Sequence, residues 1–178
     1  MKRRVLKWEL IGIVVISGLG ALLHFAFDLS GGWPPVGVIA AVNESVFEHL
    51  KLTYWPALLY AAIEYRLIGK SANNFVIAKT AGLYVMPLAI LVIFYSYTAI
   101  TGGESLIADI SVFVAAIALG QLTSYKILTR PQLSRGFQRL AVAGLVSLGV
   151  VYAVFTFYPP HSPIFVDPTT ETYGIPPT

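Results

Sequence analysis

Residues 42–51 read Val42-Asn43-Glu44-Ser45-Val46-Phe47-Glu48-His49-Leu50-Lys51. This short stretch carries two carboxylates, an amide, a hydroxyl, an imidazole and an ammonium group. If the stretch is helical, one broad face holds the side chains of Asn43, Glu44, Glu48 and Lys51. Ser45 and His49 lie next to this face. Polar groups at membrane depth are energetically costly, so they face a partner, a cavity or the interface. The stretch is therefore the leading candidate for a functional site.

The chain around this stretch has the composition of a membrane protein. Of its 178 residues, 56% are hydrophobic and only 12% are charged, and the mean hydropathy is +0.72. Soluble domains carry about 25% charged residues. The apolar residues fall in long runs, which predicts an all-α, polytopic membrane helix bundle. The absence of cysteine excludes disulfides, thiolate metal ligands and cysteine nucleophiles.

The apolar runs predict about five transmembrane helices, at residues 10–27, 53–68, 80–100, 106–128 and 140–157. The second run is short for a span. We therefore expect residues 36–52 to form a polar helix, interfacial or tilted, that kinks near Pro56 and continues into the second span. Residues 1–158 would form a single transmembrane domain. The Pro-rich tail, residues 159–178, contains several apolar side chains and is expected to dock on the outer face of that domain.

The basic residues predict the orientation in the membrane. Eleven of the twelve Lys and Arg residues lie in residues 2–7, 66–79 and 126–139. A five-span chain places these three regions on one side, which the positive-inside rule makes cytoplasmic. We therefore expect a multi-pass protein of the plasma membrane with its N-terminus inside and its C-terminus outside. The excess of basic residues reflects topology, so membrane lipids rather than nucleic acids are the expected partners.

Histidines and carboxylates gather on the expected outer side. His24 and Asp28 are spaced i, i+4 at the end of the first span, and the tail contributes His161. A divalent metal such as zinc takes three or four such ligands. The expected metal ligands are His24, Asp28, His49 and His161. Glu44 or Glu48 would serve as general base, and five further residues would support the site: Asn43, Ser45, Lys51, Asp109 and Asp167.

The same residues are compatible with other functions. A metal-free site could use a glutamate whose proton affinity is raised by burial. A path for protons or cations could use these groups as relay stations. In a structural interpretation, Glu44, Glu48 and Lys51 form an ion-pair ladder and the histidines bond locally. The sequence leaves open an enzyme acting on a lipid or lipid-linked substrate, an ion transporter and a structural or assembly protein.

Three pieces of sequence together resemble a known family: Asn43 to Lys51, the pair His24-Phe25, and the tail from His161 to Gly174. The family consists of small prokaryotic integral membrane proteins and is known as DUF6512, a domain of unknown function. The resemblance implies a membrane setting and no particular activity. The set of residues is also loosely similar to membrane-embedded zinc hydrolases of the ceramidase type. The chain departs from them in having fewer spans and no His-x-x-x-His pair.

Overall fold

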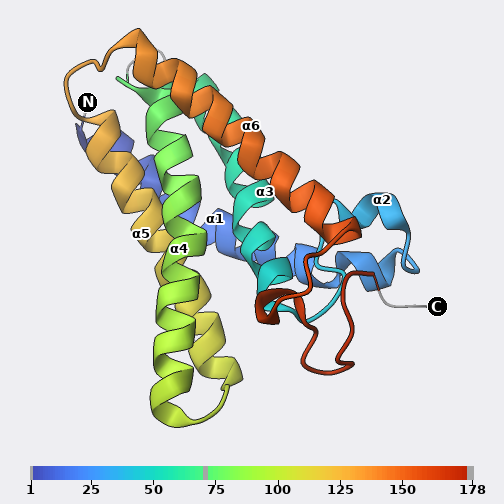
Figure 1. Cartoon of the computed structure of the whole chain (residues 1–178). Coiled ribbons are helices and arrows are strands. Elements are labelled where there is room, and N and C mark those ends of the chain that lie inside the picture. Colours follow the sequence, from blue (N-terminus) through green and yellow to red (C-terminus); the bar gives the residue numbers. More distant parts are fainter. Residues whose placement is uncertain (1, 70–71, 176–178) are drawn as a thin grey trace.

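The computed structural model describes residues 2–69 and 72–175 (Figure 1). Its elements are α1 (Lys2–Leu29), α2 (Pro34–Gly37), α3 (Val46–Glu64), the π-helical turn η1 (Tyr65–Gly69), α4 (Phe75–Thr101), α5 (Leu106–Leu128), α6 (Arg135–Phe157) and the 3-10 turn η2 (Pro163–Phe165). The described residues contain no named β-strand, and one backbone bridge joins Val166 to Tyr173. The predicted all-α class is confirmed.

Four helices of the described chain, α1, α4, α5 and α6, are long and apolar enough to cross a membrane. Their outer faces expose apolar side chains to an extent that water would not favour: Val14 is 74% exposed, Leu88 57% and Val92 65%. Lipid tails are the natural environment for such a surface. The helices thus indicate a membrane protein. The fifth predicted span corresponds to α3, which contains Glu48 and Lys51 and is not among these four.

Helix α3 lies inside the bundle, packed against α1 and α4. Its Tyr54 is 2% exposed and belongs to a buried core to which α1, α4, α5 and α6 also contribute. Helices α4 and α5 approach each other closely where two glycines meet. A Cβ atom on Gly82 would lie 2.9 Å from the carbonyl oxygen of Gly120. Small residues at such crossings allow the dense backbone packing that holds membrane helices together.

One end of the bundle collects the basic segments, and we call it the basic end: residues 2–8, 66–69, 72–79 and 126–139. There α1, η1, α4 and α5 share a small buried apolar cluster. The amide of Asn74 donates to the carbonyls of Ile127 and Pro131 at 3.2 and 2.9 Å, and its oxygen accepts from the N–H of Leu133 at 2.7 Å. The start of α4 is thereby tied to the α5–α6 connection, beside the N-terminus of α1 (Figure 1).

Residues 36–52 do not form the single helix that the sequence analysis predicted. Only Pro34–Gly37 and the part from Val46 onward are helical, and the residues between them are turns and irregular backbone. Local side-chain bonds explain the break. The side-chain oxygen of Asn43 accepts from the N–H of Ser45 at 2.9 Å. Ser45 then caps α3, and short polar side chains of this kind compete with helical hydrogen bonding.

Candidate metal centre

The candidate site lies at the end of the bundle opposite the basic end, and three separate segments build it. The last turns of α1 carry His24, the loop before α3 carries Glu44, and the first turn of α3 carries His49. The Ser45 hydroxyl accepts from the N–H of Glu48 at 3.4 Å and so fixes where α3 begins. Because the helix begins at Val46, Glu44 is not on the same helix as Glu48, contrary to the sequence prediction.

The side chains of His24, Glu44 and His49 form a triangle of ligand atoms. The two Nε2 atoms are 3.1 Å apart, and each lies 3.5 Å from Oε2 of Glu44. The three side chains are 27%, 49% and 32% exposed, so the triangle is open on one side. Within the described residues, this is the group of three whose nitrogen and carboxylate atoms all lie close enough to hold one metal ion.

The size of the triangle suits zinc. Zinc–nitrogen and zinc–oxygen bonds of about 2.0–2.1 Å place the ligand atoms of a tetrahedral site about 3.3 Å apart. The three observed separations, 3.1, 3.5 and 3.5 Å, bracket this value. Two imidazoles and one carboxylate would occupy three corners, which leaves the fourth for water or a substrate atom.

Hydrogen bonding fixes the tautomer of one histidine. Nδ1 of His49 lies 2.9 Å from the carbonyl oxygen of Ser45, so this nitrogen must donate and Nε2 keeps its lone pair. Without a metal, Nε2 of His24 must therefore donate to Nε2 of His49. Nδ1 of His24 is buried and has no hydrogen-bond partner among the described residues. Metal binding through Nε2 of His24 would require the ring proton to move to Nδ1, the nitrogen that has no hydrogen-bond partner in the described part of the chain.

Glu48 lies in a buried network beneath the triangle. It is 2% exposed, and its Oε2 accepts from Nζ of Lys51 at 2.5 Å and from the N–H of Val42 at 2.9 Å. Oε1 accepts from the hydroxyl of Thr156 at 3.1 Å, and Lys51 also donates to Thr156 at 2.7 Å and to the carbonyl of Gly37 at 2.6 Å. The carboxylate is thus fully engaged, which favours a structural role for Glu48 and Lys51.

The tail supports the loop that carries Glu44. The side-chain nitrogen of Asn43 donates to the carbonyl oxygen of Gly174 at 2.8 Å. The Phe165 ring is buried, and its centroid lies 4.5 Å from that of Phe47. Residues 176–178 of the predicted tail lie outside the described residues.

Asp167 holds the turn of the tail. Burial acts to raise the pKa of its carboxyl group. Hydrogen bonds from Thr169, from Thr170 and from the backbone N–H of Glu44 outweigh that effect and keep the pKa below its usual value. One Asp167 oxygen accepts from the backbone and the hydroxyl of Thr169, at 2.8 and 2.7 Å. The ionised carboxylate therefore stabilises the turn and connects the tail to the site loop.

The structure does not bring the other proposed ligands into the triangle. Asp28 is exposed on α1, and it is not a member of the group formed by His24, Glu44 and His49. The ring of His161 is exposed and stacks on Tyr173, with 4.7 Å between the ring centroids. Asp109, proposed as a supporting residue, accepts a hydrogen bond from the Tyr97 hydroxyl near the α4–α5 turn.

Comparison with known proteins identifies the family. The model described as "Family of unknown function (DUF6512)" matches residues 1–175. The chain belongs to this family. Among curated proteins and among solved structures, no significant match was found. Membership in the DUF6512 family agrees with the resemblance that the sequence pieces carry, and it adds no activity to what the geometry indicates.

A second buried polar cluster was missed by the sequence analysis. At the basic end of this DUF6512 protein, Lys79 pairs with Glu9 at 2.7 Å and with Glu64. Both glutamates are 0% exposed and Lys79 is 6% exposed. The sequence did contain a signal for this cluster: the three charged residues lie within or at the ends of predicted membrane helices, where an ionisable side chain needs a partner. Thr156, which joins the Glu48 network, carried no comparable signal, because a threonine in a span commonly bonds to its own helix.

Proposed function

We propose that this is an integral membrane protein that binds a divalent metal ion, zinc being the best fit, through His24, Glu44 and His49. The observation that carries the proposal is the triangle of ligand atoms, whose edges match those of a tetrahedral zinc site. Partial exposure of all three side chains supports an open fourth position. Open positions are typical of catalytic rather than structural zinc sites.

The chemistry that fits this site is metal-assisted hydrolysis. A zinc ion held by two histidines and a carboxylate polarises a carbonyl or phosphoryl oxygen and lowers the pKa of bound water. In this proposal Glu44 acts as a ligand, and Glu48 supports the loop from below through Val42. The site lies at the end of a membrane bundle, so the head group of a lipid or a lipid-linked molecule is the substrate class within its reach.

The membrane arrangement follows from the positions of the charges. The basic end faces the cytoplasm of the cell and the metal site faces the opposite side of the plasma membrane. In this arrangement α3 also crosses the bilayer, as a fifth span. Its 19 residues are about 28 Å long, close to the thickness of the hydrocarbon core. Its charged side chains lie near its two ends, at Glu48, Lys51 and Glu64, and α1 and α4 pack against it.

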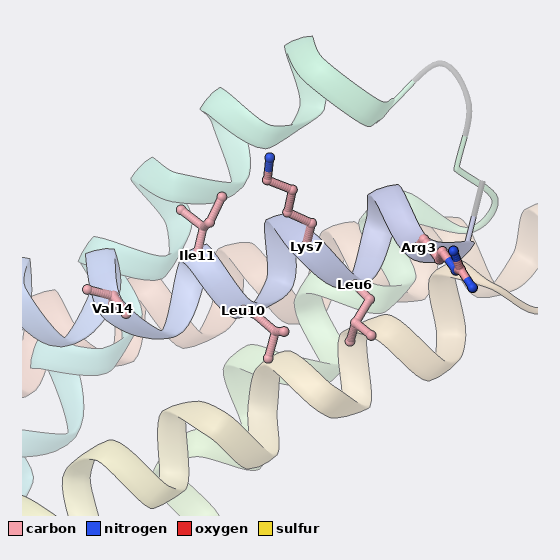
Figure 2. A pocket seen from close by; sticks show the side chains of 6 residues that line it. All are labelled: Arg3, Leu6, Lys7, Leu10, Ile11 and Val14. Atoms are coloured by element: carbon pink, nitrogen blue, oxygen red, sulfur yellow. The ribbon is translucent and has the colours of Figure 1, made fainter.

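A groove along the N-terminal half of α1, which begins at the basic end of the bundle, supports lipids as partners. Figure 2 shows the side chains that line it: Arg3, Leu6, Lys7, Leu10, Ile11 and Val14. The two cations lie toward the N-terminus and the apolar side chains continue along the helix. This order suits an acyl chain below an anionic head group, which basic side chains near a membrane surface attract.

Metal analysis of the purified full-length protein tests the proposal. We expect about one equivalent of zinc in protein purified without chelator, and loss of that zinc in His24→Ala, His49→Ala and Glu44→Gln. His161→Ala is the matched control, because it removes an imidazole from the same end of the bundle but outside the triangle. A folded wild-type protein that takes up no zinc would contradict the proposal and leave a structural role for the segment.

A further inference from the structure

The buried cluster at the basic end contains more negative than positive charge. Glu9 comes from α1, Glu64 from the end of α3 and Lys79 from the first turns of α4. Nζ of Lys79 lies 2.7 Å from Oε1 of Glu9 and also contacts Oε2 of Glu64. Two ionised carboxylates and one ammonium would leave a net charge of −1 at a place where both glutamates are fully buried.

Neutral donors do not compensate for the second carboxylate. Ser124 of α5 donates to the same Glu9 oxygen that Lys79 contacts, at 2.8 Å. The Tyr60 hydroxyl and the Gln121 amide, which also face the cluster, donate instead to the backbone carbonyls of Trp8 and Glu9. Within residues 2–69 and 72–175, Oε2 of Glu9 and Oε1 of Glu64 are buried without a hydrogen-bond partner. Buried carboxylate oxygens without donors are costly when they are ionised.

The other buried glutamate of the chain shows what a balanced site looks like. Glu48 faces one ammonium group, that of Lys51, and both of its oxygens accept hydrogen bonds. The charges there are matched one to one. The cluster at the basic end also consists of glutamate and lysine, but it has two carboxylates for one ammonium group. Unlike Glu48, its glutamates have buried oxygens that accept no hydrogen bond from the described residues.

We propose that Glu9 and Glu64 share one exchangeable proton, so that the cluster with Lys79 is a buried proton-binding site. A proton restores charge balance and turns one unsatisfied oxygen into a donor. It also needs no additional space, unlike a metal cation with its shell of oxygen ligands. The packing is tight here: a Cβ atom on Gly12, one turn from Glu9, would overlap the side chains of Gln121 and Tyr60.

The proton has a structural consequence at this end of the bundle. Loss of the proton leaves two carboxylates from α1 and α3 repelling each other with a single shared counter-charge from α4. The contact among the three helices is therefore weakened when the site releases its proton. The proposal is independent of the metal site, because the two clusters use different residues at opposite ends of the bundle.

Infrared spectroscopy of the full-length protein in detergent tests the proposal. At neutral pH the wild type should show the stretching band of a protonated carboxyl group, shifted in D2O. Glu9→Gln and Glu64→Gln should each remove the band, because the remaining carboxylate then pairs one to one with Lys79. Glu48→Gln is the matched control and should leave the band unchanged, since that site is already balanced.

Two results would overturn the proposal. The first is a wild-type spectrum without the band. The second is a band that survives both Glu9→Gln and Glu64→Gln or that disappears in Glu48→Gln. If a glutamine variant does not fold, the Glu→Asp variant at that position keeps the charge count and should shift the frequency of the band. A band that neither aspartate variant shifts would place the proton elsewhere and overturn the proposal as well.

Discussion

Glu44 and Glu48 lie on either side of the residue where α3 begins, and their environments differ completely. Glu44 precedes the helix, is half exposed and lies 3.5 Å from two imidazoles. Glu48 lies in the first turn, is 2% exposed and contacts Lys51 at 2.5 Å. Two carboxylates four residues apart therefore contribute to different tasks, one to the candidate metal centre and one to the stability of the bundle.

The first prediction concerns the stability of the buried pair. Lys51→Met leaves the Glu48 carboxylate buried without its counter-charge, which should destabilise the folded protein by about 3–5 kcal/mol. Thermal or denaturant unfolding in detergent measures this loss. Glu44→Gln is the control, because a half-exposed carboxylate contributes at most about 1 kcal/mol. Equal losses in the two variants would contradict the assignment of separate roles.

The second prediction concerns stabilisation by zinc. A ligand that binds only the folded protein stabilises it by about 2.7 kcal/mol when its free concentration is 100 times the dissociation constant. Zinc should therefore raise the melting temperature of the wild type and of His161→Ala. It should leave the melting temperature of His49→Ala unchanged. An equal rise in His49→Ala would mean that zinc binds outside the triangle.

The third prediction concerns the cap of α3. Ser45→Ala removes the hydroxyl that accepts from the N–H of Glu48 and should cost about 1 kcal/mol. Ser134 occupies the same position before α6, but its side chain makes no capping hydrogen bond to the described residues. Ser134→Ala is thus a matched control that should change the unfolding free energy little. The cap would lose its proposed importance if both variants unfolded alike.

The fourth prediction concerns the tail. Phe165→Ala removes a buried ring that packs against Phe47 and should lower stability by about 3–5 kcal/mol. The same variant should increase proteolytic cleavage within residues 159–175. Phe165→Leu retains much of the buried apolar volume and should be intermediate in both assays. Wild-type-like behaviour of Phe165→Ala would show that the tail contributes little to the fold.

The fifth prediction concerns orientation. Because the basic residues lie at one end of the bundle, a reporter fused to the C-terminus should be active only as an extracytoplasmic protein. A second reporter in the α5–α6 connection, residues 129–134, should show cytoplasmic activity. The reverse pattern would place the candidate metal centre on the cytoplasmic side and reject the proposed topology.

The sequence could predict the helices better than it could predict the contacts between them. Apolar runs located α5 at residues 106–128 and gave the main parts of α1, α4 and α6, because length and hydropathy are properties of one segment. The break before α3 was missed, although Ser45 followed by Glu48 is a capping pattern. The apolar periodicity around Ser45 predicts a helix that continues through this position, whereas the capping pattern predicts a helix that starts there. The prediction followed the periodicity.

The contacts of the sites depend on how helices are rotated against each other. The charge pattern led us to expect His24 and His49 on the same side of the membrane, and the structure brings their rings together. The convergence of Glu9, Glu64 and Lys79 could not be predicted. Hydropathy and length describe each helix separately and do not say which faces of α1, α3 and α4 pack against one another. His161 was also expected near the other histidines, and its ring stacks on Tyr173 of the tail.

The charges of α3 also bear on how the protein is made. A charged side chain raises the cost of inserting an isolated helix, by up to about 3 kcal/mol at the centre of the helix and by less toward its ends, where those of α3 lie. Lys79, the counter-charge of Glu64, and Thr156, which accepts a hydrogen bond from Lys51, belong to helices that the ribosome synthesises later. We therefore expect α3 to be poorly retained in the bilayer as a nascent chain. Its final placement would await α4 and α6, so that biogenesis of this protein proceeds by late, cooperative assembly rather than by helix-by-helix insertion.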